Sequence, residues 1–302
     1  MNIVFFMTLI FLSYVGSKLF GKRCSDLVVG GSVASYSLYF VVNGVVACAF
    51  FFVVGGFTLS INLPTAIYSI IFSIIVMISV VGLVAYKYAD VATITIVTST
   101  CGLVATSVLG ALIFKESFEL ITLIRILIML VAVILAFLDK NRGAAELVGE
   151  ERQKKKTSWL IVPIIIVVLL SNSATTIITK FYALDATVVD ENSFFFFTNV
   201  FLVAFSSIAF AVDSLRNKNH FKSAVVLVKS KSIVWLVGNV ICSNVGSLVG
   251  LLLIALIDVS VYSPVTSALG ILSGVVASLI FRERLGALSY IAAVLSCVAV
   301  FI

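Results

Sequence analysis

Residues 27–86 read LVVGGSVASYSLYFVVNGVVACAFFFVVGGFTLSINLPTAIYSIIFSIIVMISVVGLVAY, and this stretch contains no charged residue. It is long enough to cross a bilayer twice, because one membrane helix needs about 20 apolar residues. Turn-forming residues interrupt it in the middle, from Gly55-Gly56 to Asn62-Leu63-Pro64. We therefore predict two membrane helices here, at 32–54 and 65–86.

The whole 302-residue chain has the same character. Hydrophobic residues make up 62% of it and charged residues 11%, with a mean hydropathy of +1.24. A soluble domain is about half apolar and about a quarter charged. One soluble core could not bury this much apolar surface, so most of it must face lipid. This excludes a cytosolic enzyme, a secreted disulfide scaffold and a disordered chain.

The sequence offers no catalytic or metal-binding pattern. The five cysteines form no CxxC pair and are expected to be small core residues. There is no Cys/His/carboxylate cluster, no Ser/His/Asp set and no phosphate-binding glycine loop. The single His220 lies among Arg216, Lys218 and Lys222 and is expected to be a solvated loop residue. We therefore expect no enzymatic activity, no cofactor and no metal site. The net charge of +6 is expected to be loop charge beside a membrane, not a nucleic-acid surface.

Charged residues and turn formers divide the chain into ten predicted membrane helices. They lie at 3–17, 32–54, 65–86, 91–113, 119–138, 159–179, 194–212, 232–257, 259–281 and 285–302. The only long charged stretch, 139–157, is expected to be a solvated linker between a first unit, 1–138, and a second unit, 158–302.

The two units match each other in sequence. The ordered matches are Val81-Gly82-Leu83 with Val249-Gly250-Leu251, Asp90-Val91 with Asp258-Val259, Val97-Thr98-Ser99 with Val265-Thr266-Ser267, LIFKE at 112–116 with LIFRE at 279–283, and, more weakly, Asn43 with Asn199. Each unit has an odd number of spans, so the second must enter the membrane in the opposite orientation. We predict an all-α membrane protein of two inverted five-helix repeats, an architecture typical of secondary transporters.

The turns that end the fourth and ninth spans carry a family resemblance. Phe114-Lys115-Glu116-Ser117-Phe118 and the segment from Ser263-Pro264-Val265 to Phe281-Arg282-Glu283-Arg284-Leu285 resemble the drug/metabolite transporter superfamily, in particular its ten-helix EamA-like permeases. The resemblance implies five-plus-five helices around a polar cavity lined by spans 1, 3, 4, 6, 8 and 9. It also implies transport of a small molecule.

Basic residues indicate the orientation in the membrane. Of the 20 lysines and arginines, 17 lie in the loops that follow spans 1, 3, 5, 7 and 9. Lysine and arginine favour the cytoplasmic side. We therefore predict a cytoplasmic linker and two extracytoplasmic termini in the cell membrane, although many members of the resembled family keep both termini inside.

Polar side chains inside the predicted spans are the candidate site residues, because polar groups in lipid usually face the interior of a helix bundle. The substrate-binding candidates are Tyr14, Asn43, Thr98, Asn172, Asn199, Asn239, Ser243, Asn244, Tyr262 and Thr266. The alternative for each is structural, since small polar residues also bond their own helix backbone or join neighbouring helices.

Four acidic residues precede predicted spans, namely Asp90, Glu116, Asp258 and Glu283. They are expected to cap helices, with a gate salt bridge as the alternative. Two further features stay open: Arg125 either extends to the membrane surface or meets an anionic partner, and Pro264 either kinks span nine or frees a backbone carbonyl for substrate.

No Asp, Glu or His lies near the middle of any predicted span. A membrane carboxylate is usual in proton-coupled antiporters, so a neutral or zwitterionic polar metabolite is the expected substrate, carried by alternating access. The alternatives are a multidrug or toxic-compound exporter that uses aromatic residues for cation–π contact, and a membrane scaffold without transport activity. The expected partners are the substrate and the lipid bilayer, not nucleic acid, and homodimer formation stays open.

Overall fold

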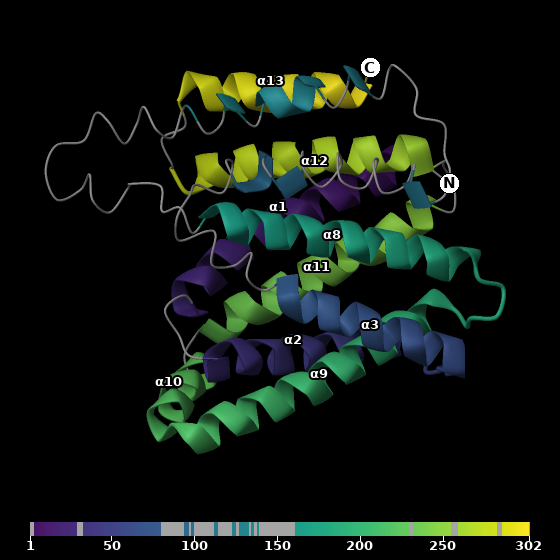
Figure 1. The fold of residues 1–302 in the computed structure, drawn as a ribbon, viewed down its shortest axis with the longest axis vertical. Coiled ribbons are helices and arrows are strands. Elements are labelled where there is room, and N and C mark those ends of the chain that lie inside the picture. The colour runs from purple at the N-terminus through teal and green to yellow at the C-terminus, as the bar shows by residue number, and fades with distance from the viewer. Residues whose placement is uncertain are drawn as a thin grey trace, which may run out of the picture.

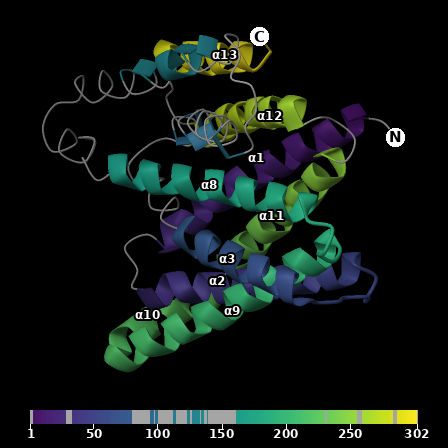
Figure 2. The same cartoon turned by 45° about the vertical axis from the view of Figure 1, so that its right-hand side comes forward.

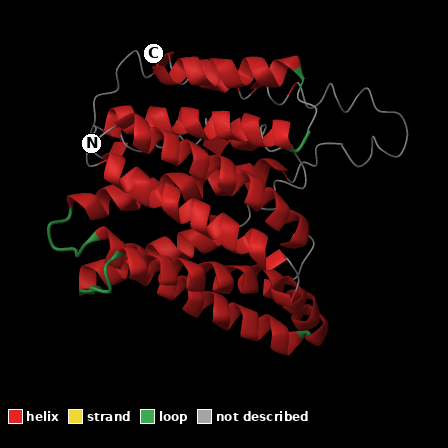
Figure 3. Cartoon of the chain, turned by 180° about the vertical axis from the view of Figure 1, so that it is seen from behind, coloured by secondary structure: helices red, strands yellow, loops and turns green. Residues whose placement is uncertain are grey.

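A computed structural model describes residues 3–28, 33–79, 161–229, 232–254, 259–282 and 286–301, with short stretches at 94–96, 98–99, 112–113, 123–124, 127–132, 134–135 and 138. Within these ranges all regular structure is helical and no strand occurs, which confirms the all-α prediction (Figure 3). The helices are α1 (Ile3–Val28), α2 (Val33–Val54), α3 (Leu63–Ser79), α8 (Ile161–Leu184), α9 (Glu191–Arg216), α10 (Lys218–Lys229), α11 (Ser232–Ile254), α12 (Val259–Ile280) and α13 (Ala287–Phe301).

Most helices run across the view in Figure 1 and are stacked one above another, from α9 and α10 at one end to α13 at the other. The 45° turn in Figure 2 preserves this order, and the N- and C-terminal ends lie on the same side of the stack in both views. Helices distant in sequence make the main contacts, with α2 against α9 and α1 against α11.

Among the described residues, four helices are long and apolar enough to cross a membrane: Val4–Cys24, Val33–Val54, Glu191–Arg216 and Ile233–Gly250. Only 22–33% of the apolar stretch of each is fully buried inside the protein, so most of its side chains are at least partly accessible to the surroundings. Shorter apolar helices accompany them at Leu63–Ile78, Ile166–Tyr182, Thr266–Ile280 and Ala287–Ala299. A surface of this kind requires lipid, and the chain is a multi-pass membrane protein.

Local chemistry explains the predicted break between α2 and α3. The chain turns at Gly55-Gly56, where Gly56 has a φ of +63° that favours glycine. Asn62 then caps α3, since its Oδ1 accepts the backbone N–H of Thr65 at 3.0 Å. Pro64 lies in the first turn of α3, where its missing N–H leaves no helix hydrogen bond unmade.

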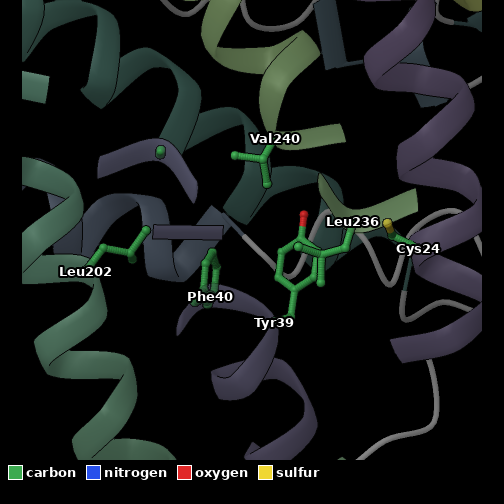
Figure 4. Close-up of a cluster of buried hydrophobic side chains, with 7 residues drawn as sticks. Cys24, Tyr39, Phe40, Leu202, Leu236 and Val240 are labelled. Carbon is green, nitrogen blue, oxygen red and sulfur yellow. The ribbon is translucent and has the colours of Figure 1, made fainter. Parts of the chain in front are cut away.

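The apolar core joins helices of both predicted units. One cluster of buried side chains contains Cys24, Tyr39, Phe40, Ala47, Leu202, Leu236 and Val240, from α1, α2, α9 and α11 (Figure 4). A second cluster joins Ile96 and Ala132 to Ile271 of α12 and to Ala292 and Ala293 of α13.

The structure corrects two sequence-based boundaries. The sequence predicts that the first helix ends at Lys18, but α1 continues to Val28 and carries Lys18, Lys22 and Arg23 on its last turns. Long basic side chains can extend from a helix end toward water, so they do not have to end the helix. The sequence also predicts a solvated loop around His220, but this segment forms α10, and His220 Nδ1 lies 3.1 Å from an Asp213 carboxylate oxygen.

Candidate functional site

Small residues bring α1 and α11 unusually close together. A Cβ placed on Gly16 would lie 2.7 Å from Cys242 Sγ, and one on Gly238 would lie 2.9 Å from the Phe20 ring. Gly246 faces Ser13 in the same way, with 3.3 Å to its Cβ. Small residues allow helix backbones to approach closely in membranes, so this pair forms a tight contact between the two predicted units.

A hydrogen-bonded polar chain lies in this contact and reaches a third helix. The Ser17 hydroxyl donates to Asn239 Oδ1 at 3.1 Å, and Asn239 Nδ2 donates to the Tyr39 hydroxyl at 3.1 Å. Asn239 is buried, with 9% of its surface exposed, so its amide depends on these partners. We call Ser17, Asn239 and Tyr39 the polar triad; it joins α1, α11 and α2.

The triad is surrounded by apolar side chains. The ring of Tyr39 lies beside Leu236 and Cys24 within the cluster drawn in Figure 4. Gly21 completes the α1 side, because a Cβ on it would lie 3.6 Å from Asn239 Oδ1. An amide offers two donors and two acceptor lone pairs, and the triad uses one donor and one acceptor of Asn239. The arrangement can therefore recognise a neutral polar group by exchange of hydrogen bonds.

Three other predicted residues lie on the same two helices. Tyr14 packs against a buried cluster formed by Phe6 and Ile10 of α1 and Val249 of α11. Asn244 donates to the backbone carbonyl of Val240 at 2.8 Å, within its own helix. Ser243 is exposed, and its backbone carbonyl accepts the Ser247 hydroxyl at 3.1 Å.

The asparagine pair Asn43 and Asn199 lies at the crossing of α2 and α9. Asn199 is buried and donates to the Phe195 carbonyl of its own helix at 2.8 Å. A Cβ on Gly44, next to Asn43, would lie 3.1 Å from the Asn199 carbonyl oxygen and 2.5 Å from a Val203 methyl. Asn43 itself is half-buried.

The remaining candidates lie elsewhere or outside the described residues. Thr98 donates to the Ile94 carbonyl at 2.8 Å, and Thr266 is half-buried on α12. Asn172 is exposed on α8. The backbone of Tyr262 belongs to α12, while its side chain falls outside the described part, as do Asp90, Glu116, Arg125, Asp258 and Glu283 entirely. The grouping of all ten binding candidates around one cavity stays a prediction.

A second polar network connects the turns of the two units at the opposite end of α2 and α9. The Tyr182 hydroxyl donates to the Val189 carbonyl at 2.6 Å, and the Val189 N–H donates to Thr65 Oγ1 at 3.1 Å. The Asn62 amide also donates to the Thr187 carbonyl. The hydroxyl and the backbone N–H of Thr187 both donate to Asp185, and these bonds hold the pKa of that carboxyl below its usual value.

Of the polar triad, the sequence-based candidates include Asn239 but not Ser17 or Tyr39. The available signal was the spacing of Ser13, Gly16, Ser17 and Gly21, which places small residues on one face of α1. Within the described ranges, no group of three or more His, Cys, Asp or Glu side chains could hold a metal ion. No protein-family model matches the chain, and no curated protein is significantly similar to it in sequence.

Proposed function

We propose that the chain is a secondary membrane transporter built from two inverted five-helix repeats, and that it moves a small neutral or zwitterionic polar metabolite by alternating access. The observation that carries the proposal is the polar triad, in which Asn239 of the second unit bonds Ser17 and Tyr39 of the first. Hydrogen bonds of this kind can break and reform as one unit moves against the other.

The helix contacts support the inverted repeat because they pair up when the units are exchanged. The order of the spans in the predicted repeat equates α1 with α8, α2 with α9 and α3 with α11. When the units are exchanged, the contact between α1 and α11 becomes the contact between α8 and α3, and both contacts are present. In the same way, the contact between α3 and α9 becomes the contact between α11 and α2, and both of these are also present. The contact of α2 with α9 corresponds to itself, as expected for two helices that cross on a pseudo-two-fold axis.

Antiparallel pairing across the units supports the same arrangement. Along α2 and α9, the Ala34 N–H bonds Asp213 at one end, and the Phe51 ring stacks on Phe195 near the other. A second antiparallel pair is formed by α12 and the segment around 94–99, where Gly274 faces Thr95 and Gly270 faces Ser99. Because the segment around 94–99 is the sequence match of α12, each of these pairs joins a helix to its own repeat in the opposite direction.

Charge at the two ends of the bundle supports the orientation. The end formed by the last turns of α1 and α9, by α10 and by the segment after α12 carries Lys18, Lys22, Arg23, Arg216, Lys218, Lys222 and Arg282. The opposite end carries Asp185, Asp190 and Glu191, with Lys180 as the only basic residue among its described side chains. The positive-inside rule places the basic end in the cytoplasm and both chain termini outside.

The substrate class follows from the chemistry of the triad and from the charge distribution. Within the described parts of the membrane helices, Lys180 and Asp213 lie within four residues of a helix end, whereas Lys18 follows Ser17 of the triad and lies ten residues before the end of α1. An amide with two hydroxyl partners offers hydrogen bonds and no net charge. A substrate with its own donors and acceptors, and without net charge, fits such a site best.

Uptake into proteoliposomes tests the proposal. Labelled neutral and zwitterionic metabolites are offered with and without a pH gradient, to the wild type, to Asn239→Ala and to Asn219→Ala. Asn219 is exposed on α10 and controls for the substitution itself. We expect at least one compound to accumulate above empty liposomes, with uptake lost in Asn239→Ala and retained in Asn219→Ala at equal protein amounts. Equal uptake by all three proteins would contradict the role of the triad.

Two other functions lead to different results in the same assay. An aromatic cluster favours an exporter of aromatic cations: Phe51 stacks on Phe195 at 5.2 Å, and Tyr182 stacks on Phe194 at 4.3 Å. That function predicts movement of a cationic dye and no uptake of the metabolite panel. A scaffold function predicts no movement of any compound, with Asn239→Ala lowering only the amount or stability of the protein.

A further inference from the structure

The corner where α9 meets α10 combines exposed cations with exposed apolar side chains. Arg216, Lys218 and Lys222 are all exposed there. Between them lie Leu215, with 86% of its surface exposed, and Phe221, with 46% exposed. Figure 1 places α10 at the end of the helix stack, beside α9 and α2. We call these five residues the basic corner.

The nearby carboxylate is already engaged by other groups. Asp213 accepts the Ala34 backbone N–H at 2.7 Å and lies 3.1 Å from His220 Nδ1. Among the described residues, no carboxylate forms an ion pair with Arg216, Lys218 or Lys222. The only other acidic residue in α2, α9, α10 and α11 is Glu191, at the far end of α9. Lys218 and Lys222 are therefore available to an external anion, while Arg216 also interacts electrostatically with Asp213 on the last turn of α9.

The geometry of α10 suits a membrane surface. Lys218 and Lys222 are four residues apart and share one helix face, with Phe221 beside them. The Phe221 ring lies 6.0 Å from the Phe210 ring, which holds α10 against α9. A face with both basic and apolar side chains suits the headgroup region of a membrane, because long lysine side chains can extend toward the phosphates while a neighbouring ring contacts the acyl chains.

We propose that the basic corner binds the phosphate headgroup of an anionic phospholipid. Arg216, Lys218 and Lys222 contact the phosphate, and Leu215 and Phe221 lie among the acyl chains. The charge difference between the two ends of the bundle assigns this lipid to the leaflet at the basic end. The inference rests on the membrane location of the chain and not on its transport activity, so it can fail or succeed independently of the proposed function.

Native mass spectrometry of the full-length protein in detergent tests the proposal. Phosphatidylglycerol and phosphatidylcholine with identical acyl chains are titrated separately, and bound lipids are counted. One basic residue near a membrane surface strengthens the binding of anionic lipid about fivefold. We expect tighter binding of phosphatidylglycerol, about fivefold weaker binding in Lys222→Gln, and a loss of more than tenfold in the triple variant Arg216→Gln/Lys218→Gln/Lys222→Gln.

The matched control is Arg282→Gln, which removes one exposed charge at the same end of the bundle but outside α9 and α10. It should bind phosphatidylglycerol like the wild type, and inorganic phosphate at millimolar concentration should not displace the lipid. The proposal is overturned if both lipids bind equally to the wild type, if Lys222→Gln and Arg282→Gln weaken binding to the same degree, or if free phosphate competes.

Discussion

Gly16 is the position where a single added methyl group should have the clearest effect. A Cβ at this position would lie 2.7 Å from Cys242 Sγ and 3.4 Å from Cys242 Cβ. Gly16→Ala therefore forces the sulfur to move or the helices to separate, and overpacking of this kind costs about 1–3 kcal/mol. In the double variant Gly16→Ala/Cys242→Ala the sulfur is removed, and the nearest atom of residue 242 is the Cβ at 3.4 Å, close to an ordinary contact.

The double variant should therefore recover most of the lost stability, with a coupling free energy of about 1–2 kcal/mol between the two sites. Reversible unfolding of the purified protein in mixed detergent micelles measures the free energy of unfolding of each variant. Gly21→Ala is the control on the same helix, since its nearest neighbour is Asn239 Oδ1 at 3.6 Å, and it should change little. Additive losses in the double variant would refute the proposed contact between Gly16 and Cys242.

Three further predictions concern other parts of the molecule. Gly274→Ala should destabilise the protein by about 1–3 kcal/mol in the same unfolding assay, because the new methyl would meet the Thr95 Cβ at 2.6 Å; a neutral effect would contradict the close approach of α12 to the segment around 94–99. On a background without native cysteines, an impermeant maleimide applied outside intact cells should label Thr187→Cys and not Asn219→Cys, and the reverse pattern would invert the orientation. Thr187→Ala removes the hydroxyl donor to Asp185, so the pKa of Asp185 should rise in an NMR titration. The stability that this hydrogen bond contributes is present above the pKa of Asp185 in the unfolded chain and is lost as the pH falls through the lowered pKa of the folded protein. An unchanged pKa in the variant would show that the Thr187 hydroxyl is not the main cause of the lowered pKa.

Local sequence chemistry was enough to predict most of the described helices and some of their ends. The charge-free run 27–86 predicted α2 and α3, and Asn62 and Pro64 marked the start of α3 because capping acts within one turn. The same reasoning failed at α10. Its lysines indicated a loop, although an amphipathic helix at a membrane surface also carries basic residues.

Tertiary contacts could not be read in the same way. Asn239 was a candidate because a buried amide needs partners, but Ser17 is 222 residues away and Tyr39 is 200 residues away. Which residues meet Asn239 depends on the register of α1 against α11. That register is set by Gly16, Gly238 and Gly246 together, and no local pattern gives it.

Movement of one unit against the other is the central claim, and a reversible cross-link between α1 and α11 tests it most directly. The Cβ–Cβ separation of 3.4 Å between positions 16 and 242 is close to the ~3.8 Å typical of a disulfide. The variant Gly16→Cys retains Cys242 and has the other cysteines replaced by alanine. In proteoliposomes, oxidation should stop the substrate exchange that this variant shows in its reduced state, and reduction should restore that exchange. Unchanged exchange by the fully cross-linked protein would contradict the account.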